Sequence, residues 1–272
     1  MKYDFILDGM VWSFSRLNAF DKCKYEWFLY YIERCEEVGG FFSDFGSFMH
    51  DILEKYLKGK LSLFELIPYY EDNFDRNIHF PPPKNNYVDL KESYFVKGRD
   101  YLLNINIKPE DFHKILGIEK KIEFVIEGFD KKQYPFVGYI DILVEDNIGN
   151  ITIIDHKSSS IKILNNGEVS KTDQKHFLEF KRQLYLYSIA VINEYRRTPK
   201  KLRWNMFKDN SWIEIDFKQE EFIETIEWAK NVIKQIYEEE LWLPDNSNSF
   251  YCNNLCSMRM NACPYKKTRY GG

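Results

Sequence analysis

Two neighbouring segments in the middle of the chain limit its possible folds more than any other feature. Residues 138–141 read G-Y-I-D and residues 153–157 read I-I-D-H-K, so each is an apolar segment that reaches an acid. β-Branched and aromatic residues are common in both, and residues 146–150 supply a turn between them. The two segments are therefore predicted to form a β-hairpin in which the acidic ends can converge.

The rest of the chain alternates between helical and β-type patterns around this hairpin. Helices are expected from Ser13 or Ser15 through Phe20, Trp27 and Tyr31, at about 43–58, 174–195 and 219–240, and strands at 115–128, 134–146, 151–157, 201–207 and 211–217. We predict an α/β (α+β) fold with a mixed central sheet flanked by helices. Residues 1–272 would form a single domain, with a mainly helical part at 1–110, an α/β core at 111–240 and a Cys-rich tail at 241–272 packed on the N-terminal helix.

The charge balance excludes a molecule that is basic all over. Lys and Arg number 38 against 42 Asp and Glu, a formal charge of −4, so no global field would gather a polyanion around the protein. Any contact with nucleic acid must be local. The length of 272 residues and the 44% apolar content suit one large domain better than two independent ones.

No segment is expected to direct the chain to a membrane. The first ten residues carry Lys2, Asp4 and Asp8 and lack an apolar signal core, and no later stretch is long enough to span a bilayer. We therefore expect a cytoplasmic protein without a membrane partner. Its five cysteines, at 23, 35, 252, 256 and 263, are an odd number in a reducing compartment, which disfavours a disulfide framework and favours metal binding.

The acids at the two strand ends indicate a site for a hard divalent cation. Mg²⁺ prefers oxygen ligands from one or two carboxylates, and Asp141 and Asp155 can supply them. Asp155 and Lys157 are two apart on a strand, so their side chains share one face, while His156 points away and offers its backbone carbonyl. A lysine beside two carboxylates and a cation can orient an attacking water and stabilise charge during phosphodiester hydrolysis.

A D-x-K triplet on a strand is, by itself, more often an exposed ion pair that contributes little energy. The residues before it favour a functional site instead. Ile151, Ile153 and Ile154 keep the strand apolar up to the acid, which places Asp155 at the edge of a core.

With these strands in place, the chain resembles the PD-(D/E)XK nuclease superfamily, and within it the RecB-like exonuclease domains, including the AddB type and the CRISPR-associated exonucleases. The motifs occur in family order from residue 13 to residue 263. S-F-S-R-L-N-A-F-D-K-C at 13–23 is similar to the opening helix, F-G-S-F-M-H at 45–50 to the G-x-x-x-H metal-binding helix, and Q-L-Y-L-Y at 183–187 to the Q-x-x-x-Y helix that follows the strands. The resemblance implies a restriction-endonuclease-like core.

The resemblance also implies roles for individual residues. His50, Asp141, Asp155 and the His156 carbonyl become metal ligands, Lys157 the catalytic lysine, and Gln183 and Tyr187 residues that line the active site. A lone histidine on a helix is more often a core or surface group, but Gly46, one turn earlier, could let the helix approach the sheet closely. A nitrogen ligand makes Mn²⁺ an alternative to Mg²⁺. For Tyr187, ordinary core packing explains the pattern nearly as well.

Three cysteines in the tail, Cys252, Cys256 and Cys263, have the spacing C-x3-C-x6-C, so their thiolates can converge on a soft metal. In the RecB-like branch that carries an iron–sulfur cluster, one early cysteine joins three late ones, and Cys23 is the candidate here. The resemblance therefore implies a 4Fe-4S cluster. The usual tail spacing is one residue shorter in each gap, so a structural zinc site, or no metal, stays an alternative. Cys35 is left over as a small buried hydrophobe.

Together these features predict a Mg²⁺- or Mn²⁺-dependent deoxyribonuclease, an exonuclease on DNA ends or single strands in recombination, repair or CRISPR- or phage-related DNA processing, with a helicase or CRISPR-associated partner. Basic residues near the helix of Gln183 are candidates for DNA contacts, although for each one alone a solvated surface explains it better: Lys181, Arg182, Arg196, Arg197, Lys200, Lys201 and Arg203. Two alternatives remain. One is a catalytically silent nuclease-fold module that binds DNA or a helicase, which the complete acids and lysine disfavour. The other is a restriction-type endonuclease, which would not need the cysteines. Residues 60–110 match no motif.

Overall fold

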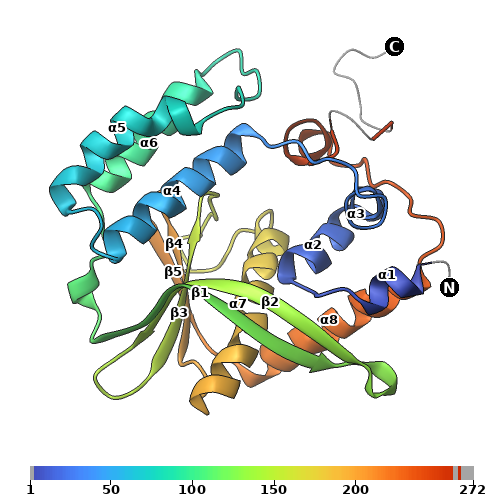
Figure 1. Cartoon of the computed structure of the whole chain (residues 1–272). Helices are drawn as coiled ribbons and strands as arrows, with labels where there is room; N and C mark the ends of the chain where they lie inside the picture. Colours follow the sequence, from blue (N-terminus) through green and yellow to red (C-terminus); the bar gives the residue numbers. More distant parts are fainter. Residues whose placement is uncertain (1–2, 260–262, 265–272) are drawn as a thin grey trace. The chain divides into compact units, whose positions relative to one another are not determined.

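The computed structural model describes residues 3–259 and 263–264 (Figure 1). The chain divides into two compact units. Unit 1 comprises Met1–Gly40, Glu123–Val137 and Ile223–Gly272. Unit 2 comprises Phe41–Ile122 and Gly138–Phe222. Among the described residues, no helix is both long and apolar enough to cross a bilayer.

Unit 2 is organised around a mixed sheet, as predicted. The strand order is β1-β2-β3-β4-β5, with two antiparallel pairs, β2–β3 and β4–β5, and one parallel pair, β3–β4. The strands are β1 (Lys114–Glu127), β2 (Gln133–Glu145), β3 (Ile151–Lys157), β4 (Lys201–Met206) and β5 (Ser211–Asp216), and the outer ends of β1 and β2 belong to unit 1. The three strands expected at 115–157 and the two short strands after 200 are therefore present.

The parallel pairing of β3 and β4 depends on the long helix between them. Parallel neighbours need a crossover connection, and α7 (Gln174–Tyr195) supplies it with the bounds expected from the sequence. Phe177 of α7 packs edge-on against Trp204 of β4, with ring centroids 5.2 Å apart. This contact fixes α7 on one face of the sheet.

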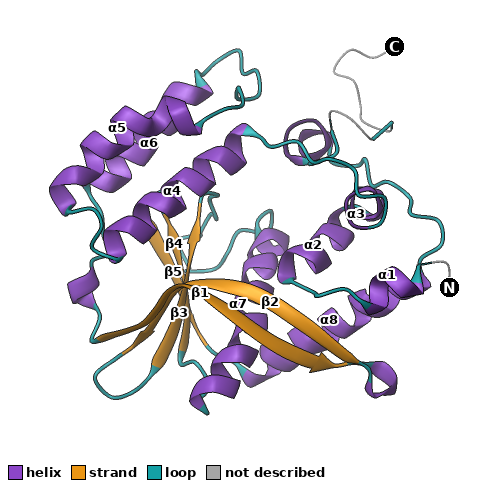
Figure 2. Cartoon of the chain, in the orientation of Figure 1, coloured by secondary structure: helices purple, strands orange, loops and turns teal. Residues whose placement is uncertain are grey.

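Helices from the first part of unit 2 cover the opposite face (Figure 2). They are α4 (Phe41–Leu57), α5 (Leu66–Asn77) and α6 (Leu90–Leu103), with the short 3-10 turns η1 (Leu63–Glu65) and η2 (Pro109–Asp111) in the connections. Buried residues of all three helices share one apolar cluster with Ile142, Ile154 and Phe207 of the sheet region. The α5–α6 pair accounts for most of residues 60–110, which the sequence left without a function.

Unit 1 has an aromatic core of its own. Its elements are α1 (Asp4–Asp8), α2 (Phe14–Lys22), α3 (Lys24–Tyr31), η3 (Phe129–Lys131), most of α8 (Gln219–Glu238) and a short π-helical turn, η4 (Tyr251–Leu255). Trp27 of α3 stacks on Trp242 with a centroid distance of 5.4 Å, and Phe20 packs edge-on against Trp27 at 5.9 Å. Large aromatic side chains thus supply much of the apolar area that this unit buries.

One expectation for unit 1 is corrected by the structure. The helix predicted to run from Ser13 through Tyr31 is interrupted at Cys23, where the backbone is extended (φ −161°, ψ 108°). Ser13 caps α2, and the Cys23 thiol accepts a hydrogen bond from the Glu26 N–H at 3.4 Å and so caps α3. The aromatic spacing continues across this break, and periodicity alone therefore does not reveal it.

Candidate active site

The two acids predicted to converge lie side by side at the ends of β2 and β3. Ile142 pairs with Ile154 in the antiparallel ladder, and Asp141 and Asp155 are the next residues along each strand beyond that pair. Asp141 is 8% exposed and Asp155 is 3% exposed. Two carboxylates this deeply buried are costly unless they are protonated, hydrogen-bonded or bound to a cation.

Asp155, Lys157 and Gln183 form a closed ring of polar contacts. Lys157 Nζ donates to Gln183 Oε1 at 2.8 Å, and Gln183 Nε2 donates to Asp155 Oδ1 at 3.0 Å. Lys157 Nζ also lies 2.7 Å from Asp155 Oδ2, but the direction is unsuited to a hydrogen bond, so this buried oxygen has no aligned donor among the described residues. The glutamine therefore holds both the acid and the lysine in place from α7.

Tyr187 lies one helical turn beyond Gln183, and its position explains the glycine of the G-Y-I-D segment. The Tyr187 hydroxyl is 3.4 Å from Gln183 Nε2. A Cβ atom on Gly138 would lie 2.5 Å from Cε1 of the tyrosine ring, closer than side chains tolerate. Gly138 is thus required for the ring of Tyr187 to rest on β2.

His50 approaches the same carboxylates from α4. Its Nε2 lies 3.1 Å from the backbone carbonyl of His156, and its Nδ1 lies 3.7 Å from Asp141 Oδ2. Because a carbonyl can only accept, Nε2 carries the hydrogen, and in the neutral ring the lone pair of Nδ1 faces the acids. A Cβ on Gly46 would meet Ser158 Oγ at 3.4 Å, an ordinary contact distance. Gly46 therefore faces the end of β3, but an alanine would also fit there.

Glu119 is a site residue that the sequence analysis missed. A carboxylate oxygen of Glu119, a ring nitrogen of His50 and a carboxylate oxygen of Asp141 all lie within 4.8 Å of one another. Glu119 belongs to β1, but its φ of 50° is left-handed, so the strand bends at this residue. The available signal was Gly117, because a glycine inside a strand often marks a bulge.

Burial and mutual repulsion alter the protonation of this cluster. Burial, and next the charge of Asp155, raise the pKa of Asp141 from 3.8 to about 7, although His50 and the N–H of His156 act in the opposite direction. Burial lowers the pKa of His50, but Glu119, Asp141 and Asp155 outweigh it, so the net direction is upward. Burial holds the pKa of His156 well below its usual value, which keeps that ring neutral. Protons thus occupy a site that a cation could take.

A family model for the PD-(D/E)XK nuclease superfamily matches residues 11–267. The chain belongs to this superfamily. The restriction-endonuclease-like fold expected from the sequence is therefore confirmed, and the family makes the protein a hydrolase that acts on nucleic acid.

One solved structure shows a similar fold at low sequence identity. The structure named "Putative exonuclease" from Eubacterium rectale is 12% identical to this PD-(D/E)XK protein, with a TM-score of 0.54, and the match covers 96% of this chain and 91% of that one. The structure of SSO0001 is 16% identical, with a TM-score of 0.36 over 82% of this chain and 98% of that one. No curated protein matches the chain.

The side chains of the PD-(D/E)XK site suit a hard divalent cation. Glu119, Asp141 and Asp155 offer carboxylate oxygens, and His50 adds one nitrogen, which is a donor set for Mg²⁺ or Mn²⁺. The buried Asp155 Oδ2 is a second indication, because it has the Lys157 ammonium at 2.7 Å but no aligned hydrogen-bond donor among the described residues. The His156 carbonyl, also expected to ligate, is occupied on one side by His50.

The basic residues predicted to bind DNA are not gathered at this site. Lys181 pairs with Glu221 at 2.7 Å, and Arg197 binds Glu145 at 2.6 Å, so both are already neutralised. Arg196 caps the far end of α7, about 22 Å from Lys181 along the helix axis. Arg182 lies next to Gln183 in the chain. A DNA-binding role for Lys181, Arg182, Arg196 and Arg197 stays a prediction.

The four cysteines considered for a cluster come together in unit 1. Cys23, Cys252, Cys256 and Cys263 line one small cavity of about 20 Å³. The Cys23 Sγ also accepts from the Asp245 N–H at 3.5 Å. Two further contacts join the tail to Glu26 of α3. The Tyr251 hydroxyl donates to Glu26 at 2.6 Å, and the Ser257 N–H also donates to Glu26, at 2.8 Å. The leftover Cys35 is half-buried against Leu29, Cys256 and Met258.

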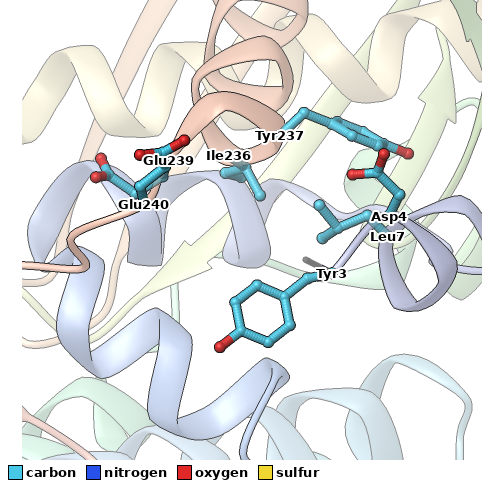
Figure 3. A pocket seen from close by; sticks show the side chains of 7 residues that line it. All are labelled: Tyr3, Asp4, Leu7, Ile236, Tyr237, Glu239 and Glu240. Carbon is cyan, nitrogen blue, oxygen red and sulfur yellow. The ribbon is translucent and has the colours of Figure 1, made fainter. Parts of the chain in front are cut away.

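A larger hollow in unit 1 does not suit nucleic acid. It has a volume of about 270 Å³ and is lined by Tyr3, Asp4, Leu7, Ile236, Tyr237, Glu239 and Glu240 (Figure 3). Figure 3 shows carboxylates on opposite sides of this hollow, with Asp4 near Tyr237 and the two glutamates across from them. An acidic lining repels phosphate, so this hollow is not a candidate for the active site.

Proposed function

We propose that this PD-(D/E)XK protein is a Mg²⁺- or Mn²⁺-dependent deoxyribonuclease that degrades DNA from its ends or as single strands. The observation that supports a working enzyme most directly is the meeting of two groups of side chains. His50, Glu119 and Asp141 have ligand atoms within 4.8 Å of one another. Beside them, Asp155 and Lys157 of β3 form a ring of contacts with Gln183 of α7. A silent module would have no reason to keep both groups intact.

The residues divide the work between binding and proton handling. His50, Glu119, Asp141 and Asp155 would hold the cation, which supplies charge neutralisation at the phosphate and activation of the attacking water. Gln183 holds Lys157 at 2.8 Å, so the ammonium stays in one orientation. Lys157 can then orient the water and stabilise negative charge on the phosphate as it develops. The exonuclease part of the proposal rests on the RecB-like order of the motifs.

Digestion of matched DNA substrates tests this proposal. End-labelled linear duplex, single strands and a covalently closed circle are incubated with Mg²⁺ or with Mn²⁺. We expect the linear duplex or the single strands to shorten from their ends while the circle persists. Cleavage of the circle would instead establish an endonuclease, and the absence of any cleavage would establish the silent module.

Two variants and one control tie the activity to this site. Lys157→Ala and Asp141→Ala should each lower the rate by about 100-fold or more, because each removes a charge that acts on the reacting atoms. Lys58→Ala is the control on the helix of His50, since Lys58 forms an exposed pair with Glu54 at 2.5 Å and should be neutral. Activity that survives both site variants would contradict the assignment.

We also propose that Cys23, Cys252, Cys256 and Cys263 hold a 4Fe-4S cluster in unit 1. Four thiolates on one Zn²⁺ would lie about 3.8 Å apart, given Zn–S bonds of about 2.3 Å. Among the described residues, no three cysteine sulfurs approach within 4.8 Å of one another, although all four line one cavity. Four cysteine thiolates are the usual ligand set of a 4Fe-4S cluster.

An anaerobic preparation decides between these groups. We expect a brown protein with iron and acid-labile sulfide, and loss of the colour in Cys256→Ser. Stoichiometric zinc, or metal-free cysteines in a folded protein, would contradict the cluster. A helicase or CRISPR-associated partner, and a role in recombination or repair, stay predictions from the motif resemblance.

A further inference from the structure

A buried chain of polar groups lies behind the D-H-K segment, on the apolar face of the sheet in unit 2. Its members are Tyr101 of α6, Asn205 of β4 and the ring of His156 in β3. Asn205 is 0% exposed and Tyr101 is 1% exposed. They lie among aliphatic and aromatic residues, where polar groups are costly unless a specific contact offsets their desolvation.

The contacts within this chain are short and specific. Asn205 Nδ2 lies 2.6 Å from the Tyr101 hydroxyl and 2.9 Å from His156 Nδ1. Asn205 and His156 are partners in the parallel β3–β4 register, so their side chains leave the sheet next to each other. Hydrogen bonds through Asn205 therefore connect the His156 ring to Tyr101 of α6, a helix that otherwise contacts the sheet by apolar packing.

The amide of Asn205 is only partly satisfied in this arrangement. Its Oδ1 is buried and has no hydrogen-bond partner among the described residues. In the reversed amide orientation, Oδ1 would accept from both the Tyr101 hydroxyl and His156 Nδ1–H. In either orientation the amide binds both neighbours, so the ring of His156 is held on one side by a rigid group.

The main chain of His156 then carries this constraint into the active site. The His156 N–H donates to Asp141 Oδ2 at 2.6 Å, and the His156 carbonyl accepts from His50 Nε2 at 3.1 Å. The two imidazole rings also meet edge to face, with centroids 5.5 Å apart and planes at 87°. The main chain of His156 thus holds both the Asp141 carboxylate and the His50 ring, which face the same candidate metal site.

We propose that Asn205 and Tyr101 are positioning residues, which hold His156 so that its main chain presents Asp141 and His50 to the divalent cation. This inference rests on the proposed metal-dependent function. The proposal gives the α5–α6 region a role in the site, because α6 carries Tyr101, the outermost of the three hydrogen-bonded side chains. Neither Asn205 nor Tyr101 would touch the cation or the DNA.

Metal binding in the absence of DNA tests the proposal directly. Binding of Mn²⁺ is measured by the loss of the free-ion paramagnetic resonance signal, with His50→Ala identifying the site. In Tyr101→Phe and in Asn205→Leu we expect Mn²⁺ to bind about tenfold more weakly, the effect typical of groups that orient metal ligands. The double variant should lose less than the two single effects combined, because both act through one ring.

Tyr70→Phe is the matched control for a merely structural effect. Tyr70 is also fully buried in the same apolar cluster, and its hydroxyl donates to the Phe95 carbonyl at 3.0 Å. Both Phe variants should lose comparable thermal stability, but Tyr70→Phe should bind Mn²⁺ like the wild type. Wild-type Mn²⁺ affinity in Tyr101→Phe, or an equal loss in Tyr70→Phe, would overturn the inference.

The same measurement separates this inference from the proposed nuclease function. A wild-type protein that binds Mn²⁺ through His50 but cleaves no DNA would refute the nuclease while leaving the positioning role in place. A protein that cleaves DNA and whose Tyr101→Phe variant keeps both its Mn²⁺ affinity and its kcat would refute only the positioning role.

Discussion

At the scale of single residues, the site is dominated by the conflict between burial and charge. Asp141 and Asp155 are almost fully buried side by side, and the structure gives them only partial compensation through the His156 N–H, Gln183 and Lys157. Without a cation, the cheapest compensation is a proton on Asp141. In the metal-free protein, the two buried carboxylates therefore destabilise the folded state, and cation binding would remove this destabilisation.

This conflict predicts how stability and metal binding depend on pH. The pKa of Asp141 is raised from 3.8 to about 7, so between these values the folded state binds more protons than the unfolded state. Stability from this group is therefore fully present below pH 3.8, and it is lost as pH rises from there to about 7. We expect Asp141→Asn to raise the Tm of the metal-free protein at pH 8 by more than about 2 °C, and to raise it by clearly less at pH 5, which lies inside the window in which this stability is being lost.

Asp146 in the β2–β3 turn provides a control of opposite sign. Hydrogen bonds from Asn150 and the turn N–H groups lower the pKa of Asp146, so its carboxylate is stabilising above that pKa. Asp146→Asn should lower the Tm at pH 8, whereas Mn²⁺ affinity of the wild type should increase as pH rises through about 7. Equal Tm shifts in the two variants at pH 8, or Mn²⁺ affinity independent of pH, would contradict the protonation of Asp141.

Glu119 combines a strained backbone with a functional side chain, and this predicts a trade between stability and binding. Its φ of 50° is unfavourable for any residue with a Cβ but not for glycine. Glu119→Gly should therefore keep or raise the Tm, while Glu119→Ala, which retains the strain, should not. Both should weaken Mn²⁺ binding, as titration of the two variants would show. Full Mn²⁺ affinity in both would remove Glu119 from the ligand set.

At the scale of elements, the seating of α7 on β2 depends on one missing side chain. A Cβ on Gly138 would lie 2.5 Å from the Tyr187 ring, and Tyr187 follows Gln183 by one turn of α7. Gly138→Ala should therefore displace the ring and with it Gln183, which holds Lys157. We expect at least tenfold lower kcat and a loss of about 1–3 kcal/mol of stability.

The control for this prediction separates crowding from the loss of the tyrosine. In the double variant Gly138→Ala, Tyr187→Leu, the smaller side chain makes room for the methyl group, so stability should recover relative to Gly138→Ala alone. A Gly138→Ala variant with wild-type kcat and Tm would show that α7 adapts without disturbing Gln183.

The elements themselves could be predicted well from the sequence, because their signals are local. The helix 174–195 and the five strands follow from apolar periodicity and turn residues, and the structure confirms them. The break at Cys23 could not be predicted, since the aromatic spacing runs through it and the cap is a single thiol. Asp141, Asp155, Lys157 and Gln183 could be brought together in advance because they lie on paired or adjacent elements.

Residues that depend on distant backbone geometry could not be found in this way. Glu119 reaches the site only because β1 bends at that residue. Gly117 signals a bulge nearby, but it does not show which side chain the bend brings to the site. Asn205 and Tyr101 look like ordinary strand and helix residues until the β3–β4 register places them beside His156. Lys181 and Arg197 illustrate another limit, because their ion pairs with Glu221 and Glu145 depend on contacts that closeness in sequence does not reveal.

At the scale of the whole molecule, charge limits how the protein can hold DNA. The formal charge is −4, and many described cations are already paired with carboxylates, among them Lys181 and Arg197. Few phosphates can therefore be neutralised at once, and most of the affinity would come from the metal site and from local contacts.

A shallow salt dependence of DNA binding follows from this balance. For about two neutralised phosphates, affinity should fall only about tenfold between 50 and 200 mM salt, whereas six to ten phosphate contacts would cost about 10³–10⁵. The measurement is fluorescence anisotropy of a labelled oligonucleotide with the slow Lys157→Ala variant and Mg²⁺, so that the metal site is filled while cleavage is suppressed. A steep fall of DNA affinity with salt would contradict this prediction, because it would require a basic surface that the net charge and the ion pairs of the described residues argue against. A shallow fall means that substrate choice depends on the active site more than on the electrostatic field of the protein.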